Sequence, residues 1–471
     1  MKKLLLFLMI WLGFASPVQA LTEAQDRPHI ILVMADDQGY GDAGYTGHPF
    51  VQTPNMDAMA QNAVVFNRFY AAAPVCSPTR ASVMTGRHPI RGNVLNHGHY
   101  LRPHEHTVAE ALHDAGYVTG HFGKWHIGSV QADSPTCPGQ MGFDRWLSGL
   151  NFFDRDPYLS DNGTYRQIEG QGSVIVMDAA LEFIEAHHDG DQPMFTVIWF
   201  PSPHDPHAET PAFDGAESLY AGRPSRGYFL EITLLDQQLG RLRTALRELD
   251  IADNTLLWYC SDNGGLVQAS SGGRARKGSI YEGGLRVPAM LEWPSRFERA
   301  SIDVPAVTSD IYPTLLAIAG ASVEHQPRLD GIDLAPILAG EQSRRPAIGF
   351  WFGIAEGDGT WNDRLISQLM EAQQAGQPTP LPERLLKNVN VFPDHANHTA
   401  RGHAAWLAWP WKLHRITRGG ETRLELYHLI DDPMESNNLA QTHPERAAAM
   451  LEDLTAWQSS VLQSHEGRDY E

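Results

Sequence analysis

A single cysteine in a distinctive setting is the first candidate for chemistry in this chain. Cys76 stands between a segment typical of a strand and one typical of a helix, with Pro78 two residues on, Arg80 four residues on and Thr-Gly-Arg at 85–87. A lone thiol in apolar surroundings is usually a small buried hydrophobic residue. The short pattern alone therefore does not establish a nucleophile, and other segments must supply the remaining groups of a reactive site.

Polar residues follow the predicted strands at the points where those strands end. Short apolar runs predict buried strands at residues 29–34, 117–122, 194–200 and 255–259. The candidates that follow them are Asp36, Asp37, Lys124, His126, His204, Asp262 and Asn263. In open parallel sheets, ligands bind outside the carboxyl ends of the strands. We therefore expect these side chains to meet at one edge of a sheet.

Four of these residues offer only oxygen ligands: Asp36, Asp37, Asp262 and Asn263. Oxygen donors are the preference of a hard cation, Ca²⁺ or alternatively Mg²⁺, whereas a zinc site is expected to bring His or Cys at ligand spacing. Adjacent carboxylates repel one another unless positive charge lies between them. The Asp36–Asp37 pair alone is equally compatible with a solvated loop, but two strand ends together favour a metal site.

The order of predicted elements indicates an α/β domain followed by a smaller one. Thr107 and Glu110 form a predicted capping box for a helix that stops at Gly116, and an amphipathic helix is predicted over residues 227–249. Residues 353–399 have no clear periodicity, and then a strand at 424–429 and a helix near 446–462 follow. We predict a larger domain over 21–345 and a C-terminal subdomain with antiparallel strands over 346–471.

The first twenty residues predict a secretory signal peptide, 1–20. Lys2 and Lys3 precede an apolar run over 4–14, and Ala20 ends a small-residue cleavage site. That run is shorter than the roughly 20 residues of a membrane-spanning helix. We expect a secreted or periplasmic protein with no membrane attachment after cleavage.

Composition excludes several other classes of protein. Only three cysteines occur in 471 residues, which excludes a disulfide scaffold and leaves Cys137 and Cys260 either paired or free. The net charge is −20, from 36 Lys and Arg against 56 Asp and Glu. Such a chain has no general affinity for nucleic acid or anionic membranes, although a metal and local cations can still create an anion site.

Taken together, these motifs resemble the type I sulfatases, which are formylglycine-dependent enzymes of the alkaline-phosphatase-like superfamily. C-x-P-x-R at Cys76 resembles the signature in which the cysteine is oxidised to formylglycine. Residues 123–128 (G-K-W-H-I-G), 203–207 (P-H-D-P-H) and 277–288 (K-G-S-I-Y-E-G-G-L-R-V-P) resemble the family blocks G-K-W-H-L-G, P-H-x-P-H and K-G-x-x-x-E-G-G-x-R-V-P. The blocks span most of the mature chain in order, whereas residues between 351 and 401 match no family motif.

The resemblance implies a fold and a site. The fold would be a large mixed sheet flanked by helices, alkaline-phosphatase-like, with a smaller C-terminal α+β domain, and 21–345 would be the catalytic domain. Calcium would be bound by an oxygen of the modified Cys76 together with the four residues named above. Such a protein needs a formylglycine-generating maturation enzyme as a partner.

Roles for the remaining residues are implied in the same way. Arg80 and Lys124 would hold the formylglycine hydrate, whose first hydroxyl attacks sulfur. His126 resembles the base that takes a proton from the second hydroxyl. His204 and Lys277 would contact the sulfate and assist the departing alcohol.

Several further residues have weaker assignments. His207 is the second imidazole of its block and an alternative or orienting partner to His204. Residues that flank the matched blocks are candidates for substrate contact or for structural use: His97, His99, Arg274 and Arg276. The aromatic group Trp406, Trp409 and Trp411 is either a stacking platform for sugar rings or, as we expect, core of the smaller domain, because alternate strand residues share a face.

Three functions remain open from the sequence. The favoured one is a sulfatase acting on a sulfated carbohydrate, because export suits an extracellular polymer or its oligosaccharides. The alternative enzyme is a phosphodiesterase or phosphonate monoester hydrolase of the same superfamily. The third is a binding module that keeps the fold without turnover, which an unmodified Cys76 would indicate.

Overall fold

The computed structural model describes residues 27–207, 213, 215, 216, 218–393 and 401–470. The predicted signal peptide, residues 1–20, lies outside the described residues. Within the described part of the chain, no helix combines the length and apolar character needed to cross a bilayer. Cys137 and Cys260 are both free and buried, which excludes a disulfide between them.

A ten-stranded mixed sheet forms the centre of the molecule, in the order β12-β2-β11-β9-β1-β8-β4-β5-β6-β7. The middle strands β9, β1, β8, β4 and β5 run parallel. Antiparallel pairs flank them on both sides, and the edge strand β12 pairs parallel with β2. The strands are β1 (His29–Ala35), β2 (Val64–Phe66), β4 (Val118–Lys124), β5 (Arg145–Gly149), β6 (Tyr158–Asp161), β7 (Thr164–Gln167), β8 (Met194–Trp199), β9 (Thr255–Ser261), β11 (Ala289–Glu292) and β12 (Ala300–Ile302). The predicted large mixed sheet of an α/β fold is confirmed.

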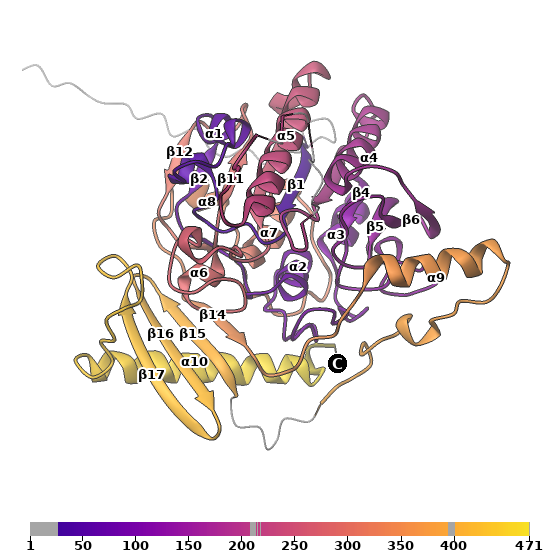
Figure 1. Ribbon diagram of the computed structural model, residues 1–471. Helices are drawn as coiled ribbons and strands as arrows, with labels where there is room; N and C mark the ends of the chain where they lie inside the picture. The colour runs from indigo at the N-terminus through magenta and orange to yellow at the C-terminus, as the bar shows by residue number, and fades with distance from the viewer. Residues whose placement is uncertain (1–26, 208–212, 214, 217, 394–400, 471) are drawn as a thin grey trace, which may run out of the picture.

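Helices cover both faces of this sheet (Figure 1). All residues of β1 are buried, as expected for a strand covered on both sides. Ile30 and Leu32 belong to the core that includes α2, α3 and α7, whereas Ile31 and Val33 belong to the core that includes α1, α4 and α5. The helices are α1 (Pro54–Ala60), α2 (Cys76–Thr85), α3 (Val108–Asp114), α4 (Gly172–His187), α5 (Arg226–Glu248), α6 (Glu282–Leu285), α7 (Ile311–Ala319), α8 (Ala335–Leu338), α9 (Asn362–Gln374) and α10 (Pro444–His465).

The local signals that position the site are present in the structure. Each of the four predicted strands is found with its ends shifted by at most two residues, as β1, β4, β8 and β9. Thr107 Oγ1 accepts from the Glu110 amide at 3.1 Å, and Glu110 Oε2 accepts from the Thr107 amide at 2.8 Å. The predicted capping box is therefore confirmed, and its helix ends at Asp114, just before Gly116.

Two smaller sheets lie against this body. A three-stranded sheet has the order β10-β3-β13, and a four-stranded antiparallel sheet has the order β14-β15-β16-β17 with α10 packed along it (Figure 1). Their strands are β3 (Phe69–Tyr70), β10 (Arg286–Val287), β13 (Ala306–Val307), β14 (Ile348–Phe352), β15 (Gly402–Ala408), β16 (Trp411–Arg418) and β17 (Glu421–His428). The predicted smaller C-terminal α+β part is confirmed.

The expected packing of the three tryptophans into the core of the C-terminal part is confirmed, but two details of the C-terminal residues differ from expectation. Trp406 lies on β15 and Trp411 on β16, and the chain reverses at Trp409, so the three rings do not share one strand. Trp406 and Trp411 pack beside α10 in the small core. The stretch without visible periodicity contains α9, whose buried Leu365 and Ile366 join the core of the main sheet.

A buried ionic network joins the small sheet to the main body. Lys412 Nζ lies 2.8 Å from Glu282 Oε1 and 3.1 Å from Glu435 Oε1. The Glu282 amide donates to Glu435 Oε2 at 2.7 Å. Removing one member of such a buried set leaves an uncompensated charge, so these contacts hold β16 in a defined position against α6.

Candidate active site and metal centre

The residues that follow the parallel strands meet at the carboxyl edge of the main sheet. They are Asp36 and Asp37 after β1, Asp262 and Asn263 after β9, His204 after β8, and Lys124 and His126 at the end of β4. The last paired residues of β1 and β9 are Ala35 and Ser261, so the pairs Asp36–Asp37 and Asp262–Asn263 emerge side by side. The expectation of a shared edge is correct.

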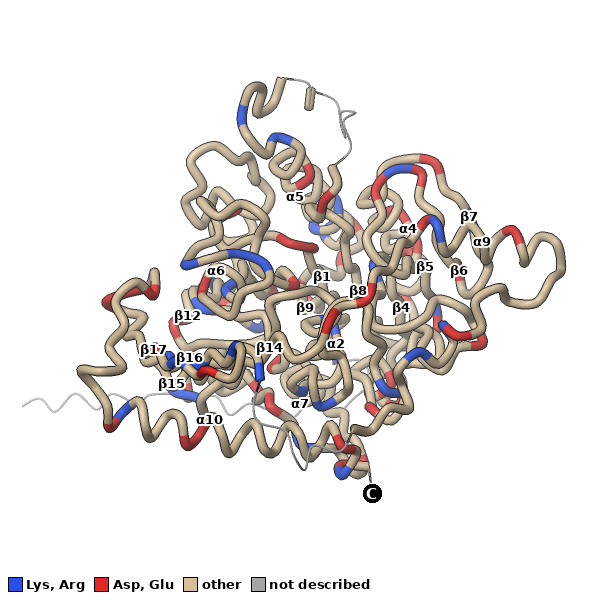
Figure 2. The backbone as a smooth tube through the Cα atoms, turned by 60° about the horizontal axis from the view of Figure 1, so that its bottom comes forward, with Lys and Arg blue, Asp and Glu red and all other residues tan. Residues whose placement is uncertain are grey.

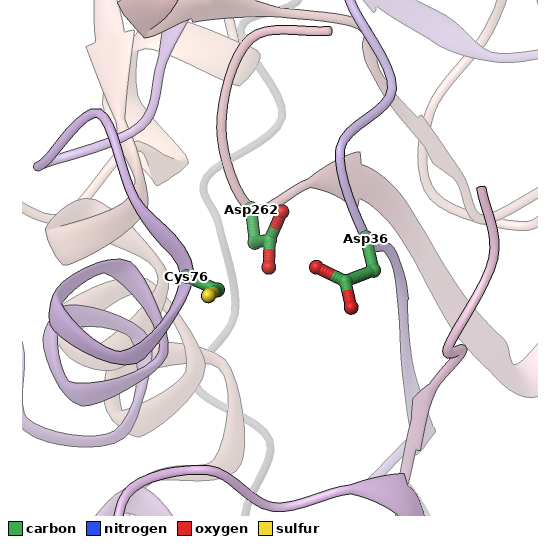
Figure 3. Close-up of side chains that lie close together, drawn as sticks. All are labelled: Asp36, Cys76 and Asp262. Atoms are coloured by element: carbon green, nitrogen blue, oxygen red, sulfur yellow. The ribbon is translucent and has the colours of Figure 1, made fainter. Parts of the chain in front are cut away.

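Cys76 is brought to the same place by α2, of which it is the first residue. Its Sγ, a carboxylate oxygen of Asp36 and one of Asp262 all lie within 4.8 Å of one another. Figure 3 shows these three side chains converging from separate segments of the chain. The residue at the nucleophile position and two predicted metal ligands thus share one small volume.

Two buried cations, Arg80 and Lys124, and the partly buried Lys277 balance the three carboxylates of the site. Lys124 Nζ lies 2.7 Å from Asp36 Oδ2, and Lys277 Nζ lies 2.7 Å from Asp37 Oδ2. Arg80 Nη2 donates to Asp262 Oδ2 at 2.8 Å, and its Nη1 donates to the Lys124 carbonyl at 3.0 Å. Each carboxylate has its own cation, which offsets the repulsion between like charges.

The oxygen atoms of the site fit a hard divalent cation. Among the residues that the structure describes, Asp36 Oδ1 and Asn263 Oδ1 are buried without a hydrogen-bond partner. Asn263 Nδ2 donates to Asp37 Oδ1 at 2.7 Å, which leaves its own carbonyl oxygen available. Buried polar oxygens rarely stay unpaired, and carboxylate and amide oxygens are ligands that Ca²⁺ and Mg²⁺ accept.

The two strand-end carboxylates have opposite pKa shifts. Burial opposes ionisation of Asp36, but the charges of Lys124, His204 and Arg80 outweigh it and hold the pKa of Asp36 below its usual value. Burial, followed by the charge of Asp36, raises the pKa of Asp262. Further positive charge between them would favour ionisation of both groups.

The imidazole of His126 is buried, and its ring nitrogens make no hydrogen bond to the residues that the structure describes. His126 lies two residues beyond the end of β4, and its backbone has a positive φ of 58°. Burial, then the charges of Lys124 and Arg80, hold the pKa of His126 well below its usual value, so the ring is neutral near pH 7 and able to accept a proton.

The two imidazoles of the 203–207 block face different surroundings. His204 Nε2 lies 3.7 Å from Asp37 Oδ2, and the ring stacks on Phe152 with centroids 5.0 Å apart. His207 Nε2 instead contacts the Pro203 carbonyl at 2.9 Å. His204 therefore faces the carboxylates, while His207 bonds to the backbone of the loop that contains both histidines.

The thiol of Cys76 is poorly suited to act unmodified. Burial raises the pKa of Cys76, since it outweighs the lowering effect of Lys124 and Lys277. A thiol with a raised pKa is mostly protonated and weakly nucleophilic.

Of the four flanking candidates, only His97 lies beside the site. Burial, then the charge of Lys277, lowers the pKa of His97, and the amide of the next residue, Gly98, donates to Ser77 Oγ at 2.9 Å. The other three have structural bonds: His99 to the Glu356 carbonyl, Arg274 to Tyr427 and the Glu435 carbonyl, and Arg276 to the Leu266 carbonyl.

Sequence reasoning missed the segment 358–362, which borders the site. Its Asp358 amide donates to the His97 carbonyl at 2.9 Å, and Asn151 Nδ2 donates to the Thr360 carbonyl at 2.7 Å. In Figure 1 this part of the chain crosses below α2 on its way to α9. The spacing of Leu365, Ile366 and Leu369 in α9 is the signal that could have revealed the helix.

Comparison with known proteins identifies the family of this chain. A family model described as Sulfatase matches residues 28–321. Arylsulfatase A of Homo sapiens is 34% identical over 398 residues, which are 74% of this chain and 73% of that protein. N-acetylgalactosamine-6-sulfatase of Canis lupus familiaris is 31% identical over 372 residues, 69% of this chain and 68% of that protein.

The fold has solved counterparts. The crystal structure of Ps i-CgsB in complex with k-i-k-neocarrahexaose superposes with a TM-score of 0.76 at 22% sequence identity, covering 94% of this chain and 97% of that chain. At this identity the likeness shows the fold alone, which is the alkaline-phosphatase-like fold. Because the family model covers most of the chain and the curated relatives align over a similar share, this chain belongs to the sulfatase family and is a sulfuric ester hydrolase.

Proposed function

We propose that this sulfatase is an exported enzyme that hydrolyses sulfate esters of a carbohydrate, using a formylglycine made from Cys76 and a bound calcium ion. The observation that carries the proposal is the approach of Cys76 Sγ to oxygens of Asp36 and Asp262 within 4.8 Å. Three cations lie around that point, two of them buried, so the site combines a nucleophile position, metal ligands and charge for an oxyanion.

Independent features support each part of the proposal. The relative N-acetylgalactosamine-6-sulfatase acts on a sugar sulfate by name, and the structural neighbour Ps i-CgsB was solved with a neocarrahexaose. The C-x-P-x-R pattern and the protonated thiol support modification of Cys76 by a formylglycine-generating enzyme. The pattern of residues 1–20 supports export to the periplasm or the medium.

The proposed chemistry divides the work between the two sides of the site. Formylglycine supplies a hydrate with two hydroxyls on one carbon, and calcium supplies positive charge for the sulfate oxygens. On the Asp36 side, Arg80 and Lys124 orient the modified residue. On the Asp37 side, Lys277 and His204 stabilise or protonate the bridging oxygen of the departing alcohol. His126, being neutral, accepts a proton at a ring nitrogen in the second half of the cycle.

Substrate class is tested with matched esters. Sulfate monoesters, phosphonate monoesters and phosphodiesters all carry one negative charge, so turnover is the measurement that separates them. The matured wild-type protein should give its highest kcat/KM on a defined sugar sulfate. A higher kcat/KM on the matched phosphonate monoester or phosphodiester would contradict the proposal and support the alternative hydrolase.

Maturation is tested on the tryptic peptide of residues 69–80. Protein co-produced with a maturation enzyme should contain this peptide with an aldehyde or its hydrate in place of the Cys76 thiol, measured by mass spectrometry. A Cys76→Ala variant is the control and should lack both the carbonyl and the activity. Fully active protein whose peptide holds only unmodified cysteine would refute the proposed nucleophile.

The metal is tested with Asp262→Ala. Loss of this carboxylate removes a ligand, so bound calcium measured by elemental analysis and kcat/KM should fall together, the latter by roughly a hundredfold or more. Asp189→Ala, which removes an exposed carboxylate, is the matched control and should change neither. The site assignment fails if purified wild-type protein contains no divalent ion and chelation leaves turnover intact.

The two histidines are distinguished by leaving-group dependence. His204→Ala should lower kcat by about 10² to 10⁴ on a sugar sulfate, whose alcohol needs a proton, and much less on an activated aryl sulfate. His126→Ala should release one burst of phenol from the aryl sulfate and then slow, because a later step loses its base. Equal losses on both substrates for His204→Ala, with no burst for His126→Ala, would argue against these roles but not against the sulfatase activity.

A further inference from the structure

A large cavity lies between the loop of residues 274–281 and the C-terminal sheet. Its volume is about 1090 Å³, and its walls include Gly278 and Ser279 from the loop and Phe352 and Ile416 from the sheet. The same loop carries Lys277, whose Nζ lies 2.7 Å from Asp37 Oδ2 in the active site. The cavity wall therefore begins one residue from a catalytic candidate.

Backbone contacts tie this wall to the nucleophile segment as well. The Gly278 amide donates to the carbonyl of Pro74 at 2.8 Å, two residues before Cys76. The opposite wall is held by the buried contacts of Lys412 with Glu282 and Glu435. Figure 2 shows α6 beside β14–β17 on one side of the molecule, with basic residues on both parts. One wall of the cavity is thus fixed to the segments that carry Lys277 and Cys76, and the other wall is held to the main body.

The lining of this cavity is basic although the chain as a whole is acidic. Four arginines line it: Arg274, Arg401, Arg418 and Arg423. The nearby acidic groups are Glu421, which also lines it, and Glu425, which lies 2.7 Å from Arg423 and 3.5 Å from Arg274. Burial, then the charge of His414, lowers the pKa of the lining residue His403 to about 2, so its ring adds no charge.

Two of these arginines have no ion pair with any residue that the structure describes. They are Arg401 and Arg418, both exposed. A guanidinium group binds an oxyanion through paired, charge-assisted hydrogen bonds. The apolar faces of Phe352 and Ile416, and the ring of Tyr281 under the Arg274 guanidinium at 3.8 Å, suit the body of a sugar. The lining therefore matches a sulfated saccharide.

We propose that this cavity binds a second sulfate group of the substrate chain, so that the enzyme prefers saccharides carrying at least two sulfates. One sulfate is hydrolysed at Cys76 while another, on a neighbouring sugar, is held by Arg401 and Arg418. This inference rests on the proposed carbohydrate activity, which it deepens by naming a multiply sulfated chain as the substrate.

The kinetic test uses the double variant Arg401→Ala/Arg418→Ala in the matured enzyme. It should lower kcat/KM at least about tenfold, through KM, on a defined disulfated oligosaccharide. Activity on the monosulfated counterpart and on an aryl sulfate should be unchanged. Arg296→Ala/Arg328→Ala removes two exposed arginines without ion pairs in the described structure, so it controls for net charge and should have no effect on any substrate.

Binding without turnover provides a second measurement. Full-length Cys76→Ser protein, titrated calorimetrically, should bind the disulfated oligosaccharide at least about tenfold more tightly than the monosulfated one, and the double arginine variant should lose that preference. Equal affinities, or a preference that survives the double variant, would overturn the inference. Equally tight binding of a chain with a carboxylate in place of the second sulfate would overturn the assignment to sulfate.

Failure of the proposed carbohydrate activity and failure of the cavity assignment would give different results. Matured enzyme that cleaves aryl sulfates but no sugar sulfate would refute the carbohydrate activity, while the titrations would still decide whether the cavity selects a second sulfate. Normal turnover of sugar sulfates without any effect of the double variant would refute the cavity assignment alone.

Discussion

Three carboxylates buried side by side are the constraint around which the structure is organised. Asp36, Asp37 and Asp262 are each 0% exposed, and their mutual repulsion in a low-dielectric site would oppose folding unless it were offset. The offset comes from one cation per carboxylate, supplied by α2, by the end of β4 and by the loop before α6. The ion pairs thereby fasten three distant segments to the carboxyl edge of the sheet.

The same electrostatics set the protonation states on which the proposed chemistry depends. Burial and two neighbouring cations keep His126 neutral, and burial keeps the Cys76 thiol protonated. A neutral imidazole is a competent base, whereas a protonated thiol is a weak nucleophile. Replacement of the thiol by a hydrated aldehyde is consistent with both observations.

Arg401 and Arg418, the residues proposed to select the substrate, lie outside the family motifs. The segment 358–362 contacts His97 and Asn151, and the small sheet forms one wall of the basic cavity. The candidate catalytic groups, in contrast, come from strand ends of the main body, from the start of α2 and from the loop before α6. The proposed chemistry and the proposed specificity therefore lie mainly on different parts of the chain, as is usual when sites are built on a widely used fold.

The sequence by itself determined the strand ends, the capping box at Thr107 and the residue types of the site, because each depends on local periodicity or on neighbouring residues. Even the meeting of Asp36 with Asp262 was predictable, since parallel strands deliver their carboxyl ends to one edge. Only the tertiary structure decided which imidazole of the 203–207 block faces the site, that Cys137 and Cys260 stay apart, and that Arg401 and Arg418 share a cavity with Ser279. Those outcomes depend on side-chain direction and on contacts between segments far apart in the chain, which local sequence patterns do not encode.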